Sequence, residues 1–128
     1  MIIGIGIDLV EVDRLKRLVE KFGERFLTRV FTKKEINYCQ SKSNSFQHFA
    51  VRFAAKEALL KAIGTGLRGG ITWLEMEISN DKLGKPTILC HGKCYDILQK
   101  LQANDPILSL SHTEHYGIAV VILEQQIR

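Results

Sequence analysis

The chain has 128 residues, 45% of them hydrophobic and 25% charged, with a net charge of +4 at pH 7, which is ordinary composition for one globular domain spanning residues 1–128. No stretch approaches the roughly 18 apolar residues of a membrane span, and Asp8 interrupts the N-terminal segment, so membrane and secreted classes are excluded and a cytoplasmic protein is predicted. The positive charge favours an anionic partner, and the three cysteines, an odd number, are predicted to be free thiols.

The first element is a strand over residues 2–8, where isoleucines alternate with small or polar residues. Gly4 and Gly6 form a nearly bare face, and glycine inside a strand often marks a place where something else comes close. Asp8 ends that face. Its carboxylate could bind a metal or a charged ligand, or simply cap a turn.

Two helices are expected next. Asp13 looks like the N-cap of the first, and Gly23 is expected to end or bend it. Thr32 and Glu35 have the spacing of a capping box that opens a short helix to about Gln40. The first helix carries a basic face, either solvated or a dock for phosphates or an acidic helix: Arg14, Arg17, Lys21 and Arg25. No nucleic-acid-binding motif accompanies it, so nucleic acid is not an expected partner.

Residues 48–66 predict a helix that is hydrophobic on all sides and therefore buried. It nevertheless carries four charged residues, namely Arg52, Lys56, Glu57 and Lys61. Glu57 and Lys61 have the spacing of a helical ion pair, which is usually a surface feature. Buried charges need partners, so we expect a metal, an anionic ligand or a neighbouring subunit here. Gly64 and Gly66 at the end would let a ligand approach the backbone.

The second half of the chain alternates between strand and turn patterns. In residues 73–79, Leu74, Met76 and Ile78 are expected to face inward. The remaining elements are a partner strand (87–90), a helix (92–104) and a second strand pair (107–112 with 117–124). The order β-α-α-α-β-β-α-β-β predicts a single α+β domain with helices packed on an antiparallel sheet. His112 and Thr113, in the last turn, offer donors that suit a phosphate, but the histidines there are too few for zinc.

Three segments carry a resemblance to a known family. They are "GIGIDLVEVDR" at 4–14, "RFAAKEALLKAIGTG" at 52–66 and "LSLSHTEHYGIAVVILE" at 108–124. In order and spacing they resemble the signature blocks of the holo-[acyl-carrier-protein] synthases, short 4'-phosphopantetheinyl transferases of fatty acid and lipid biosynthesis. The resemblance implies the 4'-phosphopantetheinyl transferase-like fold. It also implies an enzyme that moves 4'-phosphopantetheine from coenzyme A to a serine of apo acyl carrier protein and releases adenosine 3',5'-bisphosphate.

The resemblance further implies roles for single residues. Asp8 and Glu57 match the family's Mg²⁺ ligands, and Lys61 matches a lysine near the phosphates, so these three are the expected catalytic residues. Glu57, a metal-bound water and Lys61 all remain candidates for the serine's base. Positions matching the coenzyme A site are Arg52, Lys61, Gly64, Gly66, His112 and Thr113. The basic face of the first helix matches the dock for acyl carrier protein. Members are usually homotrimers with active sites between subunits, which would explain a helix that is apolar all round.

Two other classes of function fit parts of the pattern. Another coenzyme A or nucleotide-binding transferase would need no paired carboxylates for a metal. A non-enzymatic basic module that binds RNA or an acidic protein would not need the carboxylate of Glu57. The loop 41–45 contains Lys42 alone, where relatives of the family often carry several basic residues. The sequence therefore leaves open which side chain holds the 3'-phosphate of coenzyme A.

Overall fold

The computed structural model describes residues 1–126, apart from the side chain of residue 68. In chain order the elements are β1 (Ile2–Glu11), α1 (Val12–Phe22), α2 (Glu24–Val30), α3 (Lys33–Gln40), α4 (Ser45–Ile63), the 3-10 helices η1 (Gly66–Gly69) and η2 (Trp73–Glu75), β2 (Met76–Asn80), β3 (Pro86–Cys90), α5 (Gly92–Lys100), β4 (Ile107–His112) and β5 (Tyr116–Glu124). The predicted α+β class is confirmed. No helix within the described residues is long and apolar enough to cross a membrane.

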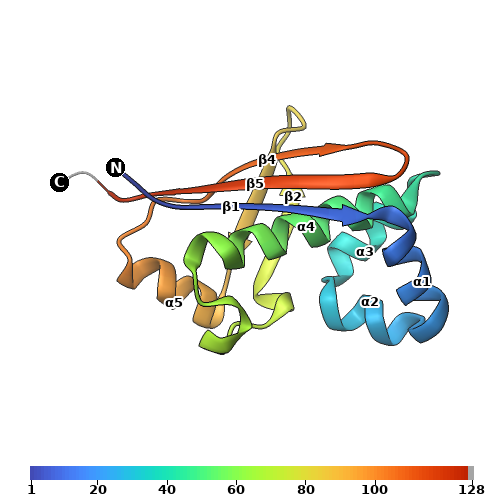
Figure 1. Ribbon diagram of the computed structural model, residues 1–128, viewed down its shortest axis with the longest axis horizontal. Coiled ribbons are helices and arrows are strands. Elements are labelled where there is room, and N and C mark those ends of the chain that lie inside the picture. The colour runs from blue at the N-terminus through green and yellow to red at the C-terminus, as the bar shows by residue number, and fades with distance from the viewer. Residues whose placement is uncertain (127–128) are drawn as a thin grey trace.

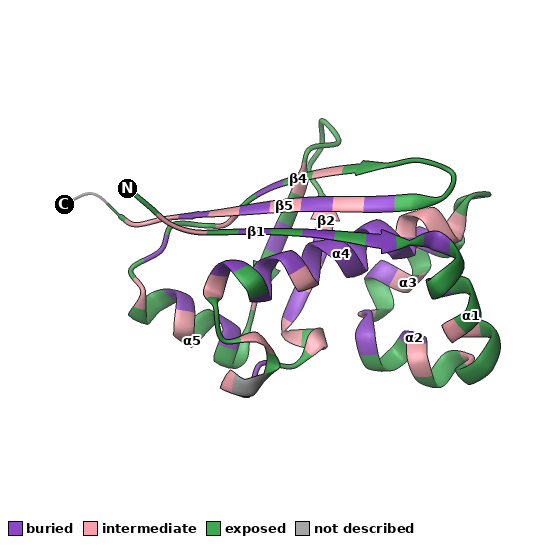
Figure 2. Ribbon diagram, viewed as in Figure 1, coloured by how far each residue is buried: buried purple, intermediate pink, exposed green. Residues whose placement is uncertain are grey.

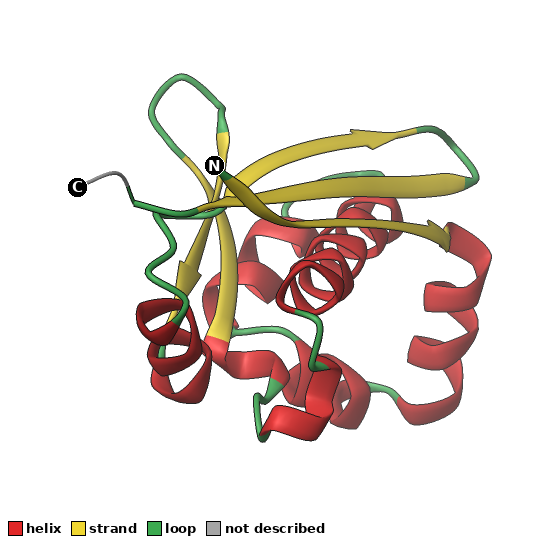
Figure 3. Cartoon of the chain, turned by 60° about the vertical axis from the view of Figure 1, so that its left-hand side comes forward, coloured by secondary structure: helices red, strands yellow, loops and turns green. Residues whose placement is uncertain are grey.

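The strands form two sheets rather than the one sheet predicted. A three-stranded sheet has the order β1-β5-β4, and β2 pairs with β3 in a separate hairpin. All pairings are antiparallel. The helices lie on one side of the three-stranded sheet, with α4 running along β1 and β5 (Figures 1 and 3). The core of the molecule therefore lies between α4 and this sheet.

The glycine face of β1 is where α4 packs. A Cβ atom added to Gly6 would lie 1.8 Å from the carbonyl oxygen of Ala58, and one added to Gly4 would lie 2.2 Å from that of Ala62. Any side chain at either position would collide with helix backbone, so glycine is required for this close packing. The predicted close approach is confirmed, but the group that approaches is the central helix rather than a ligand.

Buried and exposed residues alternate along β1 (Figure 2), and the isoleucine face is the exposed one, so it points away from the helices. Ile5, Ile7 and Leu9 are between 54% and 61% exposed. Directly opposed residues of an antiparallel pair share a face, so the partners of these three on β5 continue the apolar surface. We call this surface the outer sheet face, and its members are Ile5, Ile7, Leu9, Ile118, Val120 and Ile122.

The first helix is shorter than predicted and a second one follows it. α1 is capped by Glu11 and begins at Val12, so the expected N-cap at Asp13 is wrong by two positions. Gly23, with a φ of 60°, separates α1 from α2, which confirms the predicted break. Arg25 therefore lies on α2 and does not share one helix face with the other basic residues, and the element order gains one helix.

Other boundaries differ in smaller ways. Thr32 and Glu35 form the predicted capping box at the start of α3. Leu74 is 44% exposed because η2 replaces the first part of the expected strand, whereas Met76 and Ile78 are buried as predicted. α5 ends at Lys100 rather than at residue 104.

Candidate active site

Asp8 and Lys61 form the first contact of the site, between β1 and α4. The Lys61 ammonium donates to Asp8 Oδ1 at 2.9 Å and to the carbonyl oxygen of Ile7 at 3.0 Å. Asp8 is buried, at 9% exposure. The helical ion pair between Glu57 and Lys61 that the spacing suggests is absent from residues 1–126, because Lys61 pairs with Asp8 instead.

Glu57 faces the same carboxylate. Burial raises the pKa of Glu57, and the charge of Asp8 raises it further, while the nearby cations Arg14 and Lys61 act in the opposite direction. Asp8 Oδ2 is buried and has no hydrogen-bond partner among the described residues. The two carboxylates are therefore close enough for Asp8 to raise the pKa of Glu57 both by its charge and by a hydrogen bond with its side chain. A cation would relieve both the repulsion and the unsatisfied acceptor.

The carboxylates of Asp8 and Glu57 fit Mg²⁺ better than they fit a metal ion whose ligands all come from protein side chains. Within the described residues no group of three or more His, Cys, Asp or Glu side chains gathers around a common point. Mg²⁺ usually binds proteins through one or two carboxylates and completes its shell with water and substrate phosphates. Asp8 and Glu57 together fit that requirement.

A cleft of about 820 Å³ opens beside these groups. We call it the Glu57 pocket, and its lining is Glu57, Leu60, Lys61, Gly64, Thr65, Gly66, Gly69 and Trp73. Gly64 ends α4 with a left-handed φ of 91°, and Gly66 has a φ of 58°. The structure thus places Glu57, Lys61 and both predicted glycines around one cleft, and it adds Trp73, which the sequence interpretation missed.

Arg52 and His112 lie at a second, separate cleft of about 190 Å³. We call it the Arg52 pocket, and its lining is Tyr38, His48, Val51, Arg52, Asn80, Gly84, Pro86, Leu110 and His112. No described residue lines both pockets. The residues predicted to bind coenzyme A are therefore divided between two places in one chain.

Arg52 is only 3% exposed, and its guanidinium carbon lies 4.2 Å from the centre of the Tyr38 ring. Its Nε has no hydrogen-bond partner in the part of the chain that the structure describes. The rings of His48 and His112 are 5.3 Å apart, and burial together with the Arg52 charge lowers the pKa of His48. This pocket joins a buried cation to aromatic rings, which suits a planar anionic ligand.

Thr113 has a structural role in the turn between β4 and β5. Its hydroxyl accepts hydrogen bonds from the backbone N–H groups of His115 (3.2 Å) and Tyr116 (3.1 Å). It is absent from the lining of both pockets. Of the predicted coenzyme A residues, Thr113 alone is not brought to either cleft.

The predicted docking residues are all exposed, on α1 and α2. Arg14 lies close to Glu57, since its charge acts on that carboxyl and its guanidinium is 5.8 Å from the Phe53 ring centre. Arg25 borders an apolar groove of about 340 Å³ across the two helices, together with Leu18, Phe22, Phe26 and Arg29. The basic surface therefore surrounds an apolar strip.

Comparison with known proteins agrees with this geometry. Residues 4–121 match the family described as the 4'-phosphopantetheinyl transferase superfamily. A holo-[acyl-carrier-protein] synthase of Koribacter versatilis is 53% identical over 124 residues, which cover 97% of this chain and 99% of that protein. A holo-[acyl-carrier-protein] synthase of Geotalea daltonii is 49% identical over 125 residues, covering 98% of this chain and all of that protein.

Two solved structures are similar over nearly their whole length. The crystal structure of holo-[acyl-carrier-protein] synthase from Neisseria meningitidis has a TM-score of 0.90 and 37% identity, covering 98% of this chain and 100% of that one. The Bacillus anthracis holo-(acyl-carrier-protein) synthase in complex with coenzyme A (3',5'-ADP) has a TM-score of 0.81 and 34% identity, covering 98% and 99%.

The chain therefore belongs to the 4'-phosphopantetheinyl transferase superfamily, as the resemblance of its three segments predicts. Within that superfamily its full-length relatives are holo-[acyl-carrier-protein] synthases. The reaction is accordingly the transfer of phosphopantetheine from coenzyme A to apo acyl carrier protein.

Proposed function

We propose that residues 1–128 act as one 4'-phosphopantetheinyl transferase domain whose catalytic centre is the Glu57 pocket. The observation that carries this proposal is the proximity of Asp8 and Glu57, two carboxylates from different elements, together with the lack of a hydrogen-bond partner for Asp8 Oδ2 among the described residues. Asp8 and Glu57 would hold Mg²⁺, which supplies neutralisation of the pyrophosphate of coenzyme A.

Lys61 is the third member of the proposed centre. Its ammonium lies on the pocket lining and binds Asp8, so it can reach phosphate oxygens while it orients that carboxylate. A point charge with rotatable donors is well suited to charge that develops on a leaving phosphate. The acceptor is a serine hydroxyl of the carrier protein, which attacks the β-phosphorus and releases adenosine 3',5'-bisphosphate.

Incubation with apo acyl carrier protein, coenzyme A and Mg²⁺ tests the proposal. Intact-mass analysis is expected to show one phosphopantetheine added per carrier protein. Removal of the metal with EDTA is expected to stop the reaction, and added Mg²⁺ to restore it. A gain in mass that is the same with and without metal would contradict the role given to Asp8 and Glu57, and would favour a metal-independent coenzyme A enzyme.

We propose further that coenzyme A lies between the Glu57 pocket of one copy and the Arg52 pocket of another, in a homotrimer. The separation of the two pockets within one chain supports this arrangement. The outer sheet face supports it too, because a continuous apolar surface with three exposed residues on β1 and three half-buried ones on β5 is typical of an interface. Arg52 and His112 would then receive the adenosine 3'-phosphate end of a ligand whose pyrophosphate lies at Glu57.

The cell compartment and pathway form part of the same proposal. The three cysteines, Cys39, Cys90 and Cys94, are free thiols in the structure, as predicted, and this is the usual state in a reducing compartment. We therefore place the protein in the cytoplasm. Its holo carrier product would serve fatty acid biosynthesis.

The basic surface of α1 and α2 is proposed as the dock for acyl carrier protein. The apolar groove beside Arg25 could receive hydrophobic side chains of an acidic carrier helix, with the arginines pairing with its carboxylates. Arg14 connects this surface to the Glu57 pocket. The carrier serine would thereby be guided toward the reacting phosphate.

Charge reversal at Arg25 provides a test of the docking surface. Arg25→Glu is expected to raise KM for acyl carrier protein about tenfold at low ionic strength, with KM for coenzyme A unchanged. The difference from wild type should shrink as salt rises, because exposed charges are screened. Lys100→Glu, which makes the same charge change at an exposed position at the end of α5, is the matched control. Equal effects in the two variants would show that only net charge matters.

A further inference from the structure

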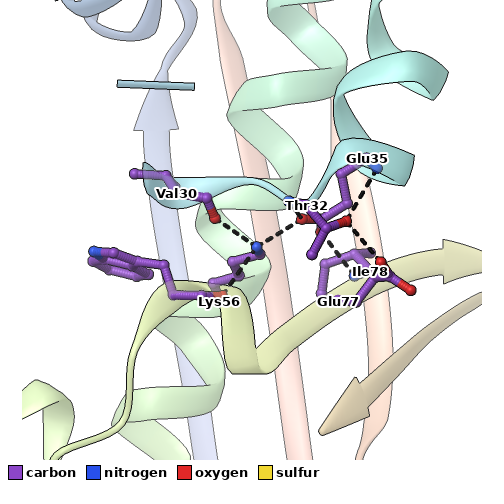
Figure 4. A network of polar contacts seen from close by, with 7 residues as sticks. Val30, Thr32, Glu35, Lys56, Glu77 and Ile78 are labelled. Atoms are coloured by element: carbon purple, nitrogen blue, oxygen red, sulfur yellow. Dashed lines mark hydrogen bonds and ion pairs between the residues drawn. The ribbon is translucent and has the colours of Figure 1, made fainter. Parts of the chain in front are cut away.

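Lys56 is a charged residue with no exposed surface, adjacent in α4 to Glu57. Its ammonium donates three hydrogen bonds, to the carbonyl oxygen of Val30 (2.7 Å), to Glu35 Oε1 (2.7 Å) and to the carbonyl oxygen of Trp73 (3.2 Å). A lysine ammonium has three donors, so every one of them is used. Figure 4 shows Lys56 between Val30 and Glu35.

Glu35 is equally enclosed, at 1% exposure, and its two carboxylate oxygens also accept backbone donors. Oε1 accepts from Thr32 N and Oε2 from Ile78 N, both at 2.8 Å. Thr32 in turn donates its hydroxyl to Glu77 Oε2 at 2.7 Å (Figure 4). The network therefore joins the end of α2, the start of α3, the middle of α4, η2 and β2.

Stability alone is a weak explanation for this pair. Burial lowers the pKa of Lys56, and the charge of Glu35 opposes that shift. Buried ion pairs often contribute no more stability than apolar side chains of similar volume would. What an apolar side chain could not supply is a directed hydrogen bond to two backbone carbonyls. The hydrogen bonds of Lys56 therefore fix the positions of these two carbonyl groups, which an apolar side chain would not do.

One of these carbonyls belongs to Trp73, which lines the Glu57 pocket. The ring of Trp73 also packs on Phe53, with ring centres 5.3 Å apart. Phe53 lies on α4, one turn before Glu57. Trp73 is thus tied to the central helix twice, through its backbone by Lys56 and through its ring by Phe53.

We propose that Lys56 is a positioning residue for the Glu57 pocket. Its ammonium binds the Trp73 carbonyl and so holds Trp73, which lines the pocket, against the helix that carries Glu57 and Lys61. This rests on the proposal that coenzyme A binds in the Glu57 pocket. Lys56 itself touches no substrate. Loss of the Lys56 ammonium should therefore make Trp73 more mobile, and it should weaken coenzyme A binding more than it slows the chemical step.

The test uses Trp73 as its own probe, because it is the one tryptophan of the sequence. Lys56→Met removes the donor but leaves Glu35 buried without its cation, which is strongly destabilising. The double variant Lys56→Met/Glu35→Gln removes both charges and keeps an acceptor for the backbone N–H of Ile78. It is the decisive variant, and its unfolding in urea is expected to resemble that of wild type more closely than the single variant does.

In the double variant, acrylamide quenching of Trp73 without substrate is expected to exceed that of wild type. KM for coenzyme A is expected to rise about tenfold while kcat stays within about threefold. Leu108→Ala is the control, since it destabilises the core at a buried position of β4 that lines neither pocket. It should leave Trp73 quenching and KM unchanged at temperatures where it is folded.

Wild-type quenching and KM in a folded double variant would overturn the proposal and leave Lys56 a stabilising residue only. A double variant without a cooperative unfolding transition would also overturn it, because the network would then be needed by the whole fold. A failure of the proposed function shows differently. In that case coenzyme A would leave the Trp73 emission of the wild-type protein unchanged, whatever the variants do.

Discussion

Glu57→Gln is expected to reduce phosphopantetheine transfer by at least about 1,000-fold while the folded protein becomes slightly more stable without metal. The loss of activity follows from the loss of one of two carboxylates that would hold Mg²⁺. The gain in stability follows from the pKa of Glu57, which burial and Asp8 raise. A carboxyl whose pKa is raised by folding costs stability as the pH rises through that pKa.

The pH dependence gives this prediction its sign. In EDTA at pH 8, Glu57→Gln is expected to unfold at a temperature about 2–5 °C above wild type, corresponding to at most about 1 kcal/mol at a site partly screened by solvent. The difference should vanish toward pH 4, where the wild-type carboxyl is protonated. Calorimetry across this range, beside the transfer assay, measures both effects.

Asp96→Asn is the matched control, because it neutralises an exposed carboxylate on α5 away from both pockets. It should leave activity and melting temperature unchanged. A Glu57→Gln protein that is less stable than wild type in EDTA would contradict the conclusion that burial and Asp8 raise the pKa of Glu57. One that is fully active would contradict its catalytic role.

Much of the site could be predicted from local patterns. The capping box of α3 depends on residues three apart, and the burial of α4 follows from side chains that are apolar in every direction. The clustering of Glu57, Lys61 and Gly64 follows from their place on one helix and its end. These features depend on spacing within one element, which a sequence displays directly.

The orientation of β1 shows where local patterns fail. Alternation defines two faces of a strand but does not say which is inside, and the apolar face is the natural choice for the interior. Here Gly4 and Gly6 face inward because α4 brings its backbone so close that no side chain fits. Ile5 and Ile7 remain on the outer side of the sheet, where they are 61% and 54% exposed.

Contacts between residues that are distant in the sequence could not be predicted from local patterns either. Glu35 lies 21 residues before Lys56, and the sequence indicates only its role in the capping box. Its carboxylate also pairs with the charge of Lys56 on α4. Tyr38 and Asn80 enter the Arg52 pocket from α3 and β2. No spacing rule connects such positions, since their proximity depends on how α3 and the β2–β3 hairpin pack around α4.

Ile7→Asp is expected to convert the proposed homotrimer into monomers and to abolish transfer at micromolar protein concentration. Ile7 lies in the middle of the outer sheet face, opposite Val120 on β5, and is 54% exposed in the single chain. On a monomer an aspartate at this position would be solvated by water. Within an interface its charge would be buried without a partner, and this desolvation costs several kcal/mol of assembly free energy for each copy. Light scattering after size exclusion measures the change in mass.

The same variant separates assembly from catalysis. Asp8, Glu57 and Lys61 lie on the opposite side of the sheet from the new charge, so the proposed catalytic groups of each chain are not altered. If coenzyme A requires the Arg52 pocket of a second copy, activity should be lost together with the trimer. Mixing Ile7→Asp with wild type should give no more activity than the wild-type share gives alone, since the altered face fits no partner.

Leu89→Asp places the same charge at a leucine of β3 that is 53% exposed but lies outside the outer sheet face. It should keep both the mass and the activity of wild type. A fully active Ile7→Asp monomer would contradict the shared site and require that one chain bind coenzyme A alone. An inactive trimer would show that Ile7 affects the active site without controlling assembly. Only the joint loss of mass and activity, with the control intact, supports a site built from two copies.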